Sequence, residues 1–451
     1  MRKFASLAAV IAAGAVLAGC ASSGGGGASP DAAVSSGGGF STVPASQSVS
    51  ITLASYMPLL GTPGTDELNS LVSGFEKAHP NIKVTIEPET SSAGIAGQIQ
   101  QDEVSGKTPD VVQDSFNDLK FMASSLGAVD LDQVAGKSQV AALFGGSAPY
   151  ATAVTKLADI NGDVYGIPWT LSTPVLFYNS DLFAKAGITA APATWAQVQA
   201  DAQKIKTATG ADGLVNGCLG AAAAGSDWCL QALLDSASGS VMNSAQTALT
   251  FNSAGNVTAL TTMQGMAKSG DMVNLSSAQA LAAFASGKLA MILNTSALAS
   301  SLLAAAGGHF TIKATELPGY GSAASVPTNS GSALFLLSKD KDKQEAAFEL
   351  MQWLTSPSSE TSITTNVGYP PLRPSIATMS QYLKSYATTN QFLAPNLAQL
   401  TKITPWLAYP GPNYNSIATQ LANAASSIVF QGADAASTLA SAQKQATTLL
   451  P

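Results

Sequence analysis

The chain has 451 residues, 46% of them hydrophobic and only 11% charged, which is long enough for two globular domains and leaves much of the surface to uncharged polar side chains. The formal net charge is −7 and no basic cluster is visible, which argues against a nucleic-acid partner. The three cysteines and two histidines have no metal-ligand spacing, so the sequence predicts neither a metal nor a cofactor.

The N-terminal region is predicted to direct export. Residues 1–19 form a predicted signal peptide, because Arg2 and Lys3 precede an apolar run shorter than the roughly 20 residues of a membrane span. The run ends in Leu-Ala-Gly-Cys20, which resembles a bacterial lipobox, and by that resemblance Cys20 becomes the lipidated N-terminus. The alternative is a plain signal peptide with an incidental cysteine. Residues 20–48, rich in Gly, Ser and Ala, are predicted to be a flexible tether.

The first globular elements follow from apolar periodicity. Alternating apolar residues predict strands at 49–53 and 82–86, separated by a helix. A further strand is expected at 109–113, directly before Asp114 and Ser115, because this segment matches the "SG..PDVV" block described below. Because ligands bind outside the carboxyl ends of strands in doubly wound sheets, we expect these two side chains to lie at a binding site.

The stretch 165–197 joins several distinct signals. Its loop leads into an apolar run at 175–178, which predicts a buried strand, and then into a short helix that ends at Gly187. Thr194 and Gln197 have the spacing of a capping box, which predicts the start of a second helix.

This stretch, "YGIPW…STPVLFYN.DLF.KAG…P.TW", resembles the extracellular solute-binding proteins of ABC importers, in the branch that takes sugars and glycerol phosphates. The resemblance extends over nearly the whole mature chain. Further similar blocks are "SG..PDVV" at 105–112, "A…F..GK.AM" at 278–291 and "GY.P.r" at 368–373. The alternative is a strand and helices of another α/β protein.

The resemblance implies an α/β fold of the periplasmic-binding-protein type II, with two lobes, three interlobe crossovers and a ligand cleft that closes by hinge bending. We expect lobe one to comprise 49–172 plus 294–331, and lobe two to comprise 173–293 plus 332–451. It also implies ABC permease subunits as partners, a monomeric chain, and an extracytoplasmic location on the bacterial cell membrane.

The remaining elements lie in the C-terminal half. An oxidising location favours a disulfide between Cys218 and Cys229, with two buried thiols as the alternative. Apolar periodicity predicts a helix at 339–355 and closing helices at 415–430 and 433–449.

A cleft that holds a sugar needs aromatic faces and hydrogen-bonding groups. The aromatic candidates are Tyr56, Trp169, Trp228, Tyr369, Trp406, Tyr409 and Tyr414. The other candidates are Ser55, Ser91, Ser92, Asp114, Ser115, Ser172, Gly331, Ser332 and Arg373.

The glycerol-phosphate branch allows a sharper comparison. The chain keeps three of that branch's ligand positions, at Ser172, Gly331 and Tyr369. It replaces three others, with Ser92 for a tyrosine, Phe116 or a neighbour for a glutamate, and Ala418 for an arginine.

Loss of that arginine removes the charged fork that a phosphate monoester prefers. Arg373 is a candidate to replace the lost arginine, but the simpler interpretation is that Arg373 forms a surface ion pair near the hinge. We therefore expect an uncharged sugar or oligosaccharide, with glycerol 3-phosphate or a glycerophosphodiester as the alternative.

Two other classes of function remain as hypotheses. A glycoside hydrolase needs paired carboxylates across a cleft, and the predicted cleft loops offer chiefly Asp114 and Asp227. No GxSxG, HExxH or P-loop motif is present, so we expect no enzyme. A surface lipoprotein that does not take part in transport is the other hypothesis.

Overall fold

The computed structural model describes residues 39–451 except 90–94, 224–226 and 412. The predicted signal peptide, the lipidation site Cys20 and the candidates Ser91 and Ser92 therefore lie outside the described residues. No helix in the described ranges combines the length and apolarity needed to cross a membrane.

The end of the predicted tether is part of the fold. Val43 is buried, and its N–H donates to Glu349 Oε1 at 2.6 Å. The ring of Phe40 lies 5.4 Å from the ring of Phe348. The prediction of a flexible tether is therefore wrong for residues 39–48, because the apolar side chains of this otherwise polar segment pack against a helix.

The first sheet has five strands in the order β2-β1-β3-β11-β6, with β1 parallel to β2 and β3, and β11 antiparallel to both of its neighbours. Its strands are β1 (Val49–Ser55), β2 (Ile82–Pro88), β3 (Val111–Ser115), β6 (Gly166–Ser172) and β11 (Ser330–Leu336). The accompanying α-helices are α1 (Thr62–Ala78), α2 (Ile95–Ser105), α3 (Leu119–Ser125), α4 (Lys137–Phe144), α5 (Thr152–Thr155), α12 (Lys341–Leu354) and α13 (Pro357–Asn366). Shorter elements are η1 (Met57–Leu60), η2 (Phe116–Asp118), η3 (Asp132–Gly136), η4 (Lys156–Ala158) and the two-stranded β4 (Asp159–Ile160) and β5 (Asp163–Val164).

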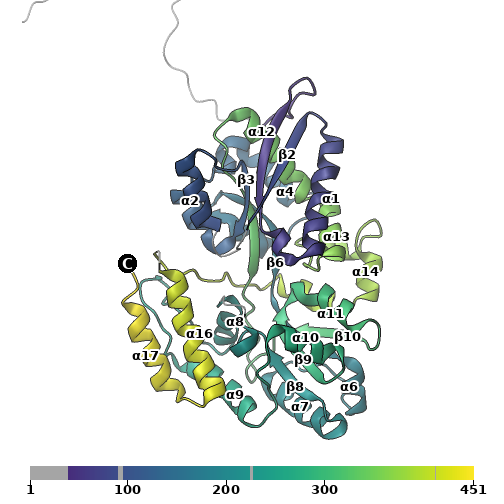
Figure 1. Ribbon diagram of the computed structural model, residues 1–451, viewed down its shortest axis with the longest axis vertical. Coiled ribbons are helices and arrows are strands. Elements are labelled where there is room, and N and C mark those ends of the chain that lie inside the picture. The colour runs from purple at the N-terminus through teal and green to yellow at the C-terminus, as the bar shows by residue number, and fades with distance from the viewer. Residues whose placement is uncertain (1–38, 90–94, 224–226, 412) are drawn as a thin grey trace, which may run out of the picture. The chain divides into compact units, whose positions relative to one another are not determined.

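Side chains alternate along each strand, so both faces of the first sheet carry apolar side chains, and helices cover both faces. Ile51 and Leu53 of β1 face a core shared with α1 and α12. Ala54 faces a second core, to which α2 and α3 contribute. Helices thus form a layer on each side of the strands, as Figure 1 shows for α1 and α2.

The second sheet has four strands in the order β10-β7-β9-β8. Its strands are β7 (Pro174–Asn179), β8 (Asp212–Asn216), β9 (Leu289–Thr295) and β10 (Ile312–Glu316). The accompanying helices are α6 (Ser180–Lys185), α7 (Trp195–Thr209), η5 (Gly220–Ala222), α8 (Trp228–Ser236), α9 (Ala254–Lys268), α10 (Ser277–Ala285), η6 (Ser296–Leu298), α11 (Ala299–Ala306), α15 (Leu393–Gln399), α16 (Tyr414–Gln431) and α17 (Ala435–Thr447). The connecting elements η7 (Pro374–Thr378) and α14 (Lys384–Thr389) precede α15.

Most of the stretch 165–197 folds as its sequence predicts, but the loop expected before residue 175 is wrong, because Gly166–Ser172 form the buried strand β6. Residues 174–179 form β7, whose side chains alternate between two cores. Thr194 and Gln197 make both hydrogen bonds of the predicted capping box at the start of α7. Gly187 follows α6 with φ +70°, a backbone conformation that glycine adopts without strain.

Within the described residues the chain passes between the two lobes three times, after β6, after β10 and after residue 373, so two of the predicted boundaries are wrong. β10 pairs with β7, so 294–316 stays with the second sheet. β11 then inserts between β3 and β6, and 330–373 completes the first lobe. The prediction failed because β9 is followed by a helical excursion that returns β10 to its own sheet. We refer to 39–172 with 330–373 as the first lobe, and to 174–316 with 393–451 as the second.

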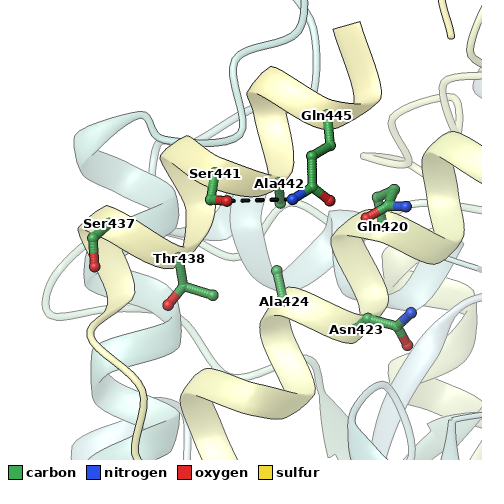
Figure 2. Close-up of a pocket in the computed structure, with 8 residues that line it drawn as sticks. All are labelled: Gln420, Asn423, Ala424, Ser437, Thr438, Ser441, Ala442 and Gln445. Carbon is green, nitrogen blue, oxygen red and sulfur yellow. Dashed lines mark hydrogen bonds between the residues drawn. The ribbon is translucent and has the colours of Figure 1, made fainter. Parts of the chain in front are cut away.

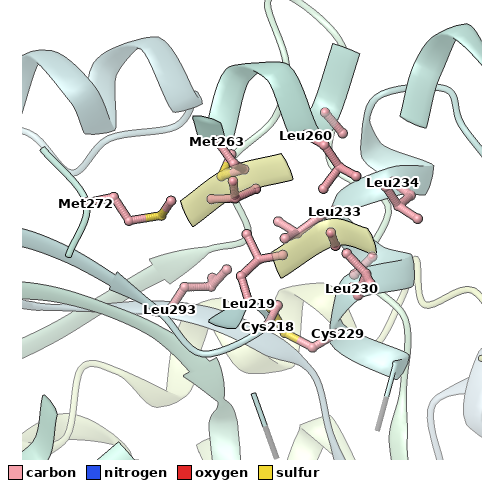
Figure 3. Close-up of a cluster of buried hydrophobic side chains, with 14 of the residues drawn as sticks. Cys218, Leu219, Cys229, Leu230, Leu233, Leu234, Leu260, Met263, Met272 and Leu293 are labelled. Atoms are coloured by element: carbon pink, nitrogen blue, oxygen red, sulfur yellow. A yellow bond between two sulfur atoms is a disulfide. The ribbon is translucent and has the colours of Figure 1, made fainter. Parts of the chain in front are cut away.

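The predicted Cys218–Cys229 disulfide is present and lies in the core of the second lobe, among leucine and methionine side chains (Figure 3). Replacing both cysteines with alanine is expected to lower the free energy of unfolding by about 2–3 kcal/mol, because the unfolded chain gains freedom. Urea denaturation with and without dithiothreitol checks this. Dithiothreitol should destabilise the wild type and leave the stability of the double variant unchanged. Equal free energies of unfolding of the wild type and the double variant without dithiothreitol would contradict the prediction.

Gly331 occupies a position that no other residue fits. Its φ is +122°, and a Cβ there would lie 2.1 Å from the carbonyl oxygen of Thr170 on the neighbouring strand β6. Gly331→Ala is therefore expected to cost at least about 2 kcal/mol of stability, measured by urea denaturation. Gly265→Ala, in α9 with no atom within 4 Å of the added carbon, is the matched control and should be neutral or stabilising. Equal effects of the two substitutions would refute the steric account.

Candidate functional site

A cleft of about 850 Å³ lies between η2 and α3 of the first lobe and the segment 405–414 of the second. η2 follows β3 directly, so the strand's carboxyl end delivers Phe116, Asn117 and Asp118 to one wall. The volume lies in the range of small-molecule sites. The remaining lining residues are Ala96, Gly97, Leu119, Lys120, Phe121, Ser124, Lys156, Leu157, Asp159, Gln246, Asn329, Pro405, Trp406, Leu407, Ala408, Tyr409, Pro410, Gly411 and Tyr414.

Asp227 fixes the aromatic wall of this cleft. Its Oδ1 accepts a hydrogen bond from Trp406 Nε1 at 2.8 Å, and its Oδ2 accepts one from Tyr409 Oη at 2.9 Å. Burial raises the pKa of Asp227, while hydrogen bonds from Gln231 and the two aromatic side chains lower it. The backbone N–H of Trp406 also donates to Asn329 Oδ1 at 3.0 Å. The loop is therefore held by buried polar contacts rather than by secondary structure.

The opposite wall carries carboxylates. Asp118 lines the cleft and is 9% exposed, and burial raises its pKa to about 6. Asp114, near the end of strand β3, is fully buried; burial and then the charge of Asp118 raise its pKa. Tyr414, across the cleft, has its pKa raised by burial and by the charges of both aspartates. These three side chains therefore interact across the two lobes.

A hydrogen-bonded network of buried side chains lies on strands β1, β3, β6 and β11. Ser55 Oγ donates to Gln113 Oε1 at 2.6 Å, and Gln113 Nε2 donates to Ser332 Oγ at 3.0 Å. Ser332 Oγ in turn bonds Thr170 Oγ1 at 2.7 Å. Tyr56 is buried beside this network. Burial raises the pKa of Tyr56, and the neighbouring hydrogen-bonding side chains lower it by a smaller amount. Of the predicted ligand residues, Ser55, Tyr56 and Ser332 thus join the strands together and are not part of the cleft lining.

Trp169 and Tyr369 belong to the hydrophobic core of the first lobe. Trp169 is 2% exposed, and its Nε1 donates to the carbonyl oxygen of Leu354 at 3.0 Å. Burial raises the pKa of Tyr369. The prediction that these rings face the cleft is wrong: Trp169 lies on strand β6, which is buried on both faces, and Tyr369, in the loop after α13, packs into the same core.

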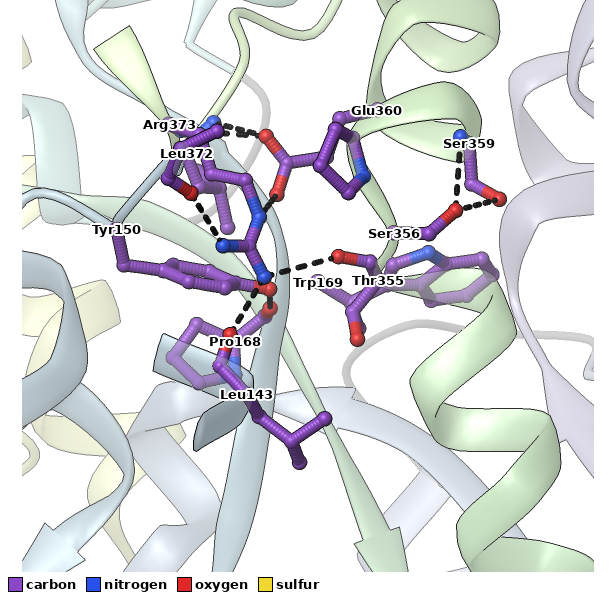
Figure 4. Close-up of polar contacts among 12 residues, drawn as sticks. Leu143, Tyr150, Pro168, Trp169, Thr355, Ser356, Ser359, Glu360, Leu372 and Arg373 are labelled. Carbon is purple, nitrogen blue, oxygen red and sulfur yellow. Dashed lines mark hydrogen bonds and ion pairs between the residues drawn. The ribbon is translucent and has the colours of Figure 1, made fainter. Parts of the chain in front are cut away.

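Arg373 is a structural residue (Figure 4). Its Nε donates to Glu360 Oε1 at 3.0 Å, and its terminal nitrogens donate to the carbonyl oxygens of Ala148 and Leu143. The guanidinium lies 4.0 Å from the ring centre of Tyr150. The arginine is therefore unavailable to a ligand, and the expected surface ion pair is a buried one.

The other predicted residues have local roles. The hydroxyl of Ser115 accepts from the N–H of Asn117 at 3.2 Å and begins η2. Ser172 is buried at the end of β6, opposite Ser330. Trp228 begins α8 and packs against the core of the second lobe. None of the three is among the cleft-lining residues.

The predicted residues that do line the cleft are Trp406, Tyr409 and Tyr414, from the loop whose content of proline and aromatic residues drew attention in the sequence. Residues 116–121 were missed as a group. Their place directly after β3 was an available signal, because it puts them at a strand's carboxyl end.

A second depression of about 400 Å³ lies between α16 and α17 (Figure 2). Its lining is uncharged and consists of Gln420, Asn423, Ala424, Ser437, Thr438, Ser441, Ala442 and Gln445. It has no aromatic side chain and belongs to one lobe only. The described residues also contain no cluster of three or more side chains able to hold a metal ion.

Comparisons with known proteins agree with this architecture. The chain is 26% identical over 321 residues to the sn-glycerol-3-phosphate-binding periplasmic protein UgpB of Yersinia enterocolitica, covering 68% of this chain and 71% of the relative. A 51-residue stretch is 47% identical to a putative binding protein of Brucella abortus, covering 11% of this chain and 12% of that protein.

Solved structures share the fold at low sequence identity. The cyclic alpha-maltosyl-1,6-maltose binding protein of Arthrobacter globiformis matches with TM-score 0.72 and 19% identity, covering 89% of this chain and 98% of that one. UgpB from Mycobacterium tuberculosis, in complex with glycerophosphocholine, matches with TM-score 0.73 and 19% identity, covering 88% and 98%. The profile of the bacterial extracellular solute-binding proteins matches residues 61–361. The chain therefore belongs to the bacterial extracellular solute-binding protein family, with its two-lobed α/β fold.

Proposed function

We propose that this chain is the substrate-binding lipoprotein of an ABC importer, and that it captures a sugar or oligosaccharide in the interlobe cleft. The observation that carries the proposal is the lining of that cleft. Aromatic faces of Phe116, Trp406 and Tyr414 come from both lobes and are accompanied by the amides of Asn117 and Asn329. Flat apolar faces combined with hydrogen-bonding groups suit a pyranose ring.

Delivery follows from the placement of these residues on two lobes. A ligand that contacts both walls favours the closed conformation of the two lobes, and the permease subunits would bind the protein in that conformation. Anchoring through Cys20, a location on the outer side of the bacterial cell membrane and a monomeric state complete the proposal.

Glycerol 3-phosphate or a glycerophosphodiester is the second candidate. It is favoured by the names of the related proteins and by Lys120 and Lys156, which line the cleft. Both lysines are exposed, and no arginine is among the described lining residues. A phosphate held there would lack a fixed, charged fork, so we rank the sugar first.

Hydrolysis is disfavoured by the same contacts. Asp227, one of the carboxylates expected of a hydrolase, accepts bonds from Trp406, Tyr409 and Gln231. The related proteins with a named ligand are binding proteins. Location of the gene beside two permease genes would separate an importer component from a lipoprotein without a transport role.

Isothermal titration of the mature protein with malto- and cello-oligosaccharides, glycerol 3-phosphate and glycerophosphocholine tests the proposal. We expect saturable binding of a saccharide and no conversion of it. Tight binding of the phosphorylated compounds alone would reverse the ranking, and release of shorter saccharides would replace the binder with an enzyme.

A further inference from the structure

The carboxylate of Asp118 faces the cleft without a counter-charge. The residue is 9% exposed and lines the cavity, and no described side chain or backbone group is hydrogen-bonded or ion-paired with it. Only burial contributes to the rise of its pKa to about 6, so no basic group in the described part of the chain offsets the loss of solvation. Residues 90–94, outside that part, include no lysine or arginine in their sequence.

Asp114 adds a second carboxylate behind the first. It is fully buried, and its Oδ1 accepts a hydrogen bond from the N–H of Ser115 at 2.7 Å. Its Oδ2 is buried with no partner among the described groups. Because the charge of Asp118 raises the pKa of Asp114, the two acids repel one another at the same wall. A ligand without positive charge leaves that repulsion in place.

The lysines of the cleft do not neutralise this wall. Lys120 and Lys156 are exposed, and Lys120 Nζ donates to Gln246 Oε1 of the second lobe at 3.4 Å. Neither lysine contributes to the pKa of Asp118 or of Asp114. Asp118, with Asp114 buried behind the cleft lining, therefore makes the wall opposite Trp406 and Tyr414 acidic.

A hydroxyl group would satisfy the hydrogen-bonding capacity of Asp118 but not its charge, whereas an ammonium group satisfies both. The facing rings add to the attraction, since a cation is stabilised at an aromatic face. A quaternary ammonium supplies the charge without an N–H donor. We infer that the preferred ligand is a saccharide bearing a protonated primary amine, an inference that rests on the proposed function. The amine donates hydrogen bonds to Asp118, beside Asp114, and lies near Tyr414.

Calorimetry on the full mature protein at pH 7 tests this with a glucosamine oligosaccharide, the N-acetylated oligosaccharide of the same length, and glycerophosphocholine. We expect the amine to bind at least about tenfold more tightly than the acetylated compound. A tenfold difference in affinity is the interaction free energy that corresponds to a pKa shift of about one unit. Asp118→Asn should abolish that preference. Asp181→Asn, which removes an exposed acid of α6 outside the described cleft lining, should retain it.

The pH dependence supplies an independent readout. The amine binds the ionised carboxylate, so lowering the pH from 7 to 5, through the raised pKa of about 6, should reduce its affinity by about tenfold. Asp118→Asn should remove most of this decrease. The groups around the acid that share this pH window or carry charge are Asp114, Asp159, Glu89, Lys120 and Lys156. Tyr409 and Tyr414 are also ionisable, but burial raises their pKa values, so they stay uncharged between pH 5 and 7.

The outcomes separate this inference from the function on which it rests. Equal affinity for the amine and the acetylated saccharide would overturn the inference and leave a sugar-binding protein. Tighter binding of glycerophosphocholine than of the amine would overturn the requirement for N–H donors. Failure of every saccharide, neutral or basic, would reject the proposed function as well.

Discussion

Replacing Arg373 with alanine is expected to lower the free energy of unfolding by about 3–5 kcal/mol, the typical cost of breaking a buried ion pair by removing one partner. The substitution leaves Glu360, which is 2% exposed, without its counter-charge. Burial already raises the pKa of Glu360 to about 7, and the charge of Arg373 acts in the opposite direction. The carbonyl oxygens of Ala148 and Leu143 also lose their donors. Urea denaturation measures the loss.

The matched control is Lys206→Ala, which removes the 2.8 Å ion pair with Asp212 at the surface. Exposed pairs contribute about 0–1 kcal/mol, so this variant should unfold close to the wild type. A loss below about 1 kcal/mol for Arg373→Ala would show that the arginine is not the structural residue described above. It would also restore Arg373 as a ligand candidate.

The second large effect concerns binding. Trp406→Ala is expected to weaken saccharide affinity by about 30–150-fold, because it removes a large aromatic face near the centre of the cleft, at a cost of about 2–3 kcal/mol. The side chain is held in place by Asp227, so its position does not depend on the ligand. Isothermal titration with the best saccharide of the panel measures the change.

Trp353→Ala is the corresponding control. This tryptophan is also partly buried and also donates its Nε1 proton, to the carbonyl oxygen of Leu71 at 2.9 Å, but it packs on the first lobe away from the cleft lining. The control should change stability and leave saccharide affinity within about twofold of the wild type, since separate sites act independently. Similar losses of affinity in both variants would argue against the cleft as the binding site.

Local patterns in the sequence were sufficient for most of the secondary structure. The apolar run at 175–178 and the capping box at Thr194 depend on neighbours within a few residues, and both give the elements expected. The lobe boundaries depend on which sheet a strand joins. β10 and β11 are both short strands, and nothing in either sequence states that β10 pairs with β7 while β11 pairs with β3 and β6. Pairing is decided by long-range packing, which periodicity does not encode.

The candidate site was predicted in part, for a similar reason. Trp406, in a loop, and Tyr414, at the start of α16, are only partly buried, and both line the cleft. Trp169 and Tyr369 carry the resemblance to the family most strongly, yet both are packed in the first-lobe core. A motif can thus be preserved for the core as well as for the ligand. Asp118 was missed because an acidic residue in a sequence does not reveal that it will be buried without a counter-charge.

The central claim is that a polar small molecule is held, unaltered, between η2 of the first lobe and the segment 405–414 of the second. A crystal structure of the mature protein with the saccharide that binds best in calorimetry tests it most directly. We predict an intact saccharide in contact with Asn117 or Asp118 on one side and with Trp406 and Tyr414 on the other. A saccharide found in the depression between α16 and α17, or one cleaved in the cleft, would contradict the account.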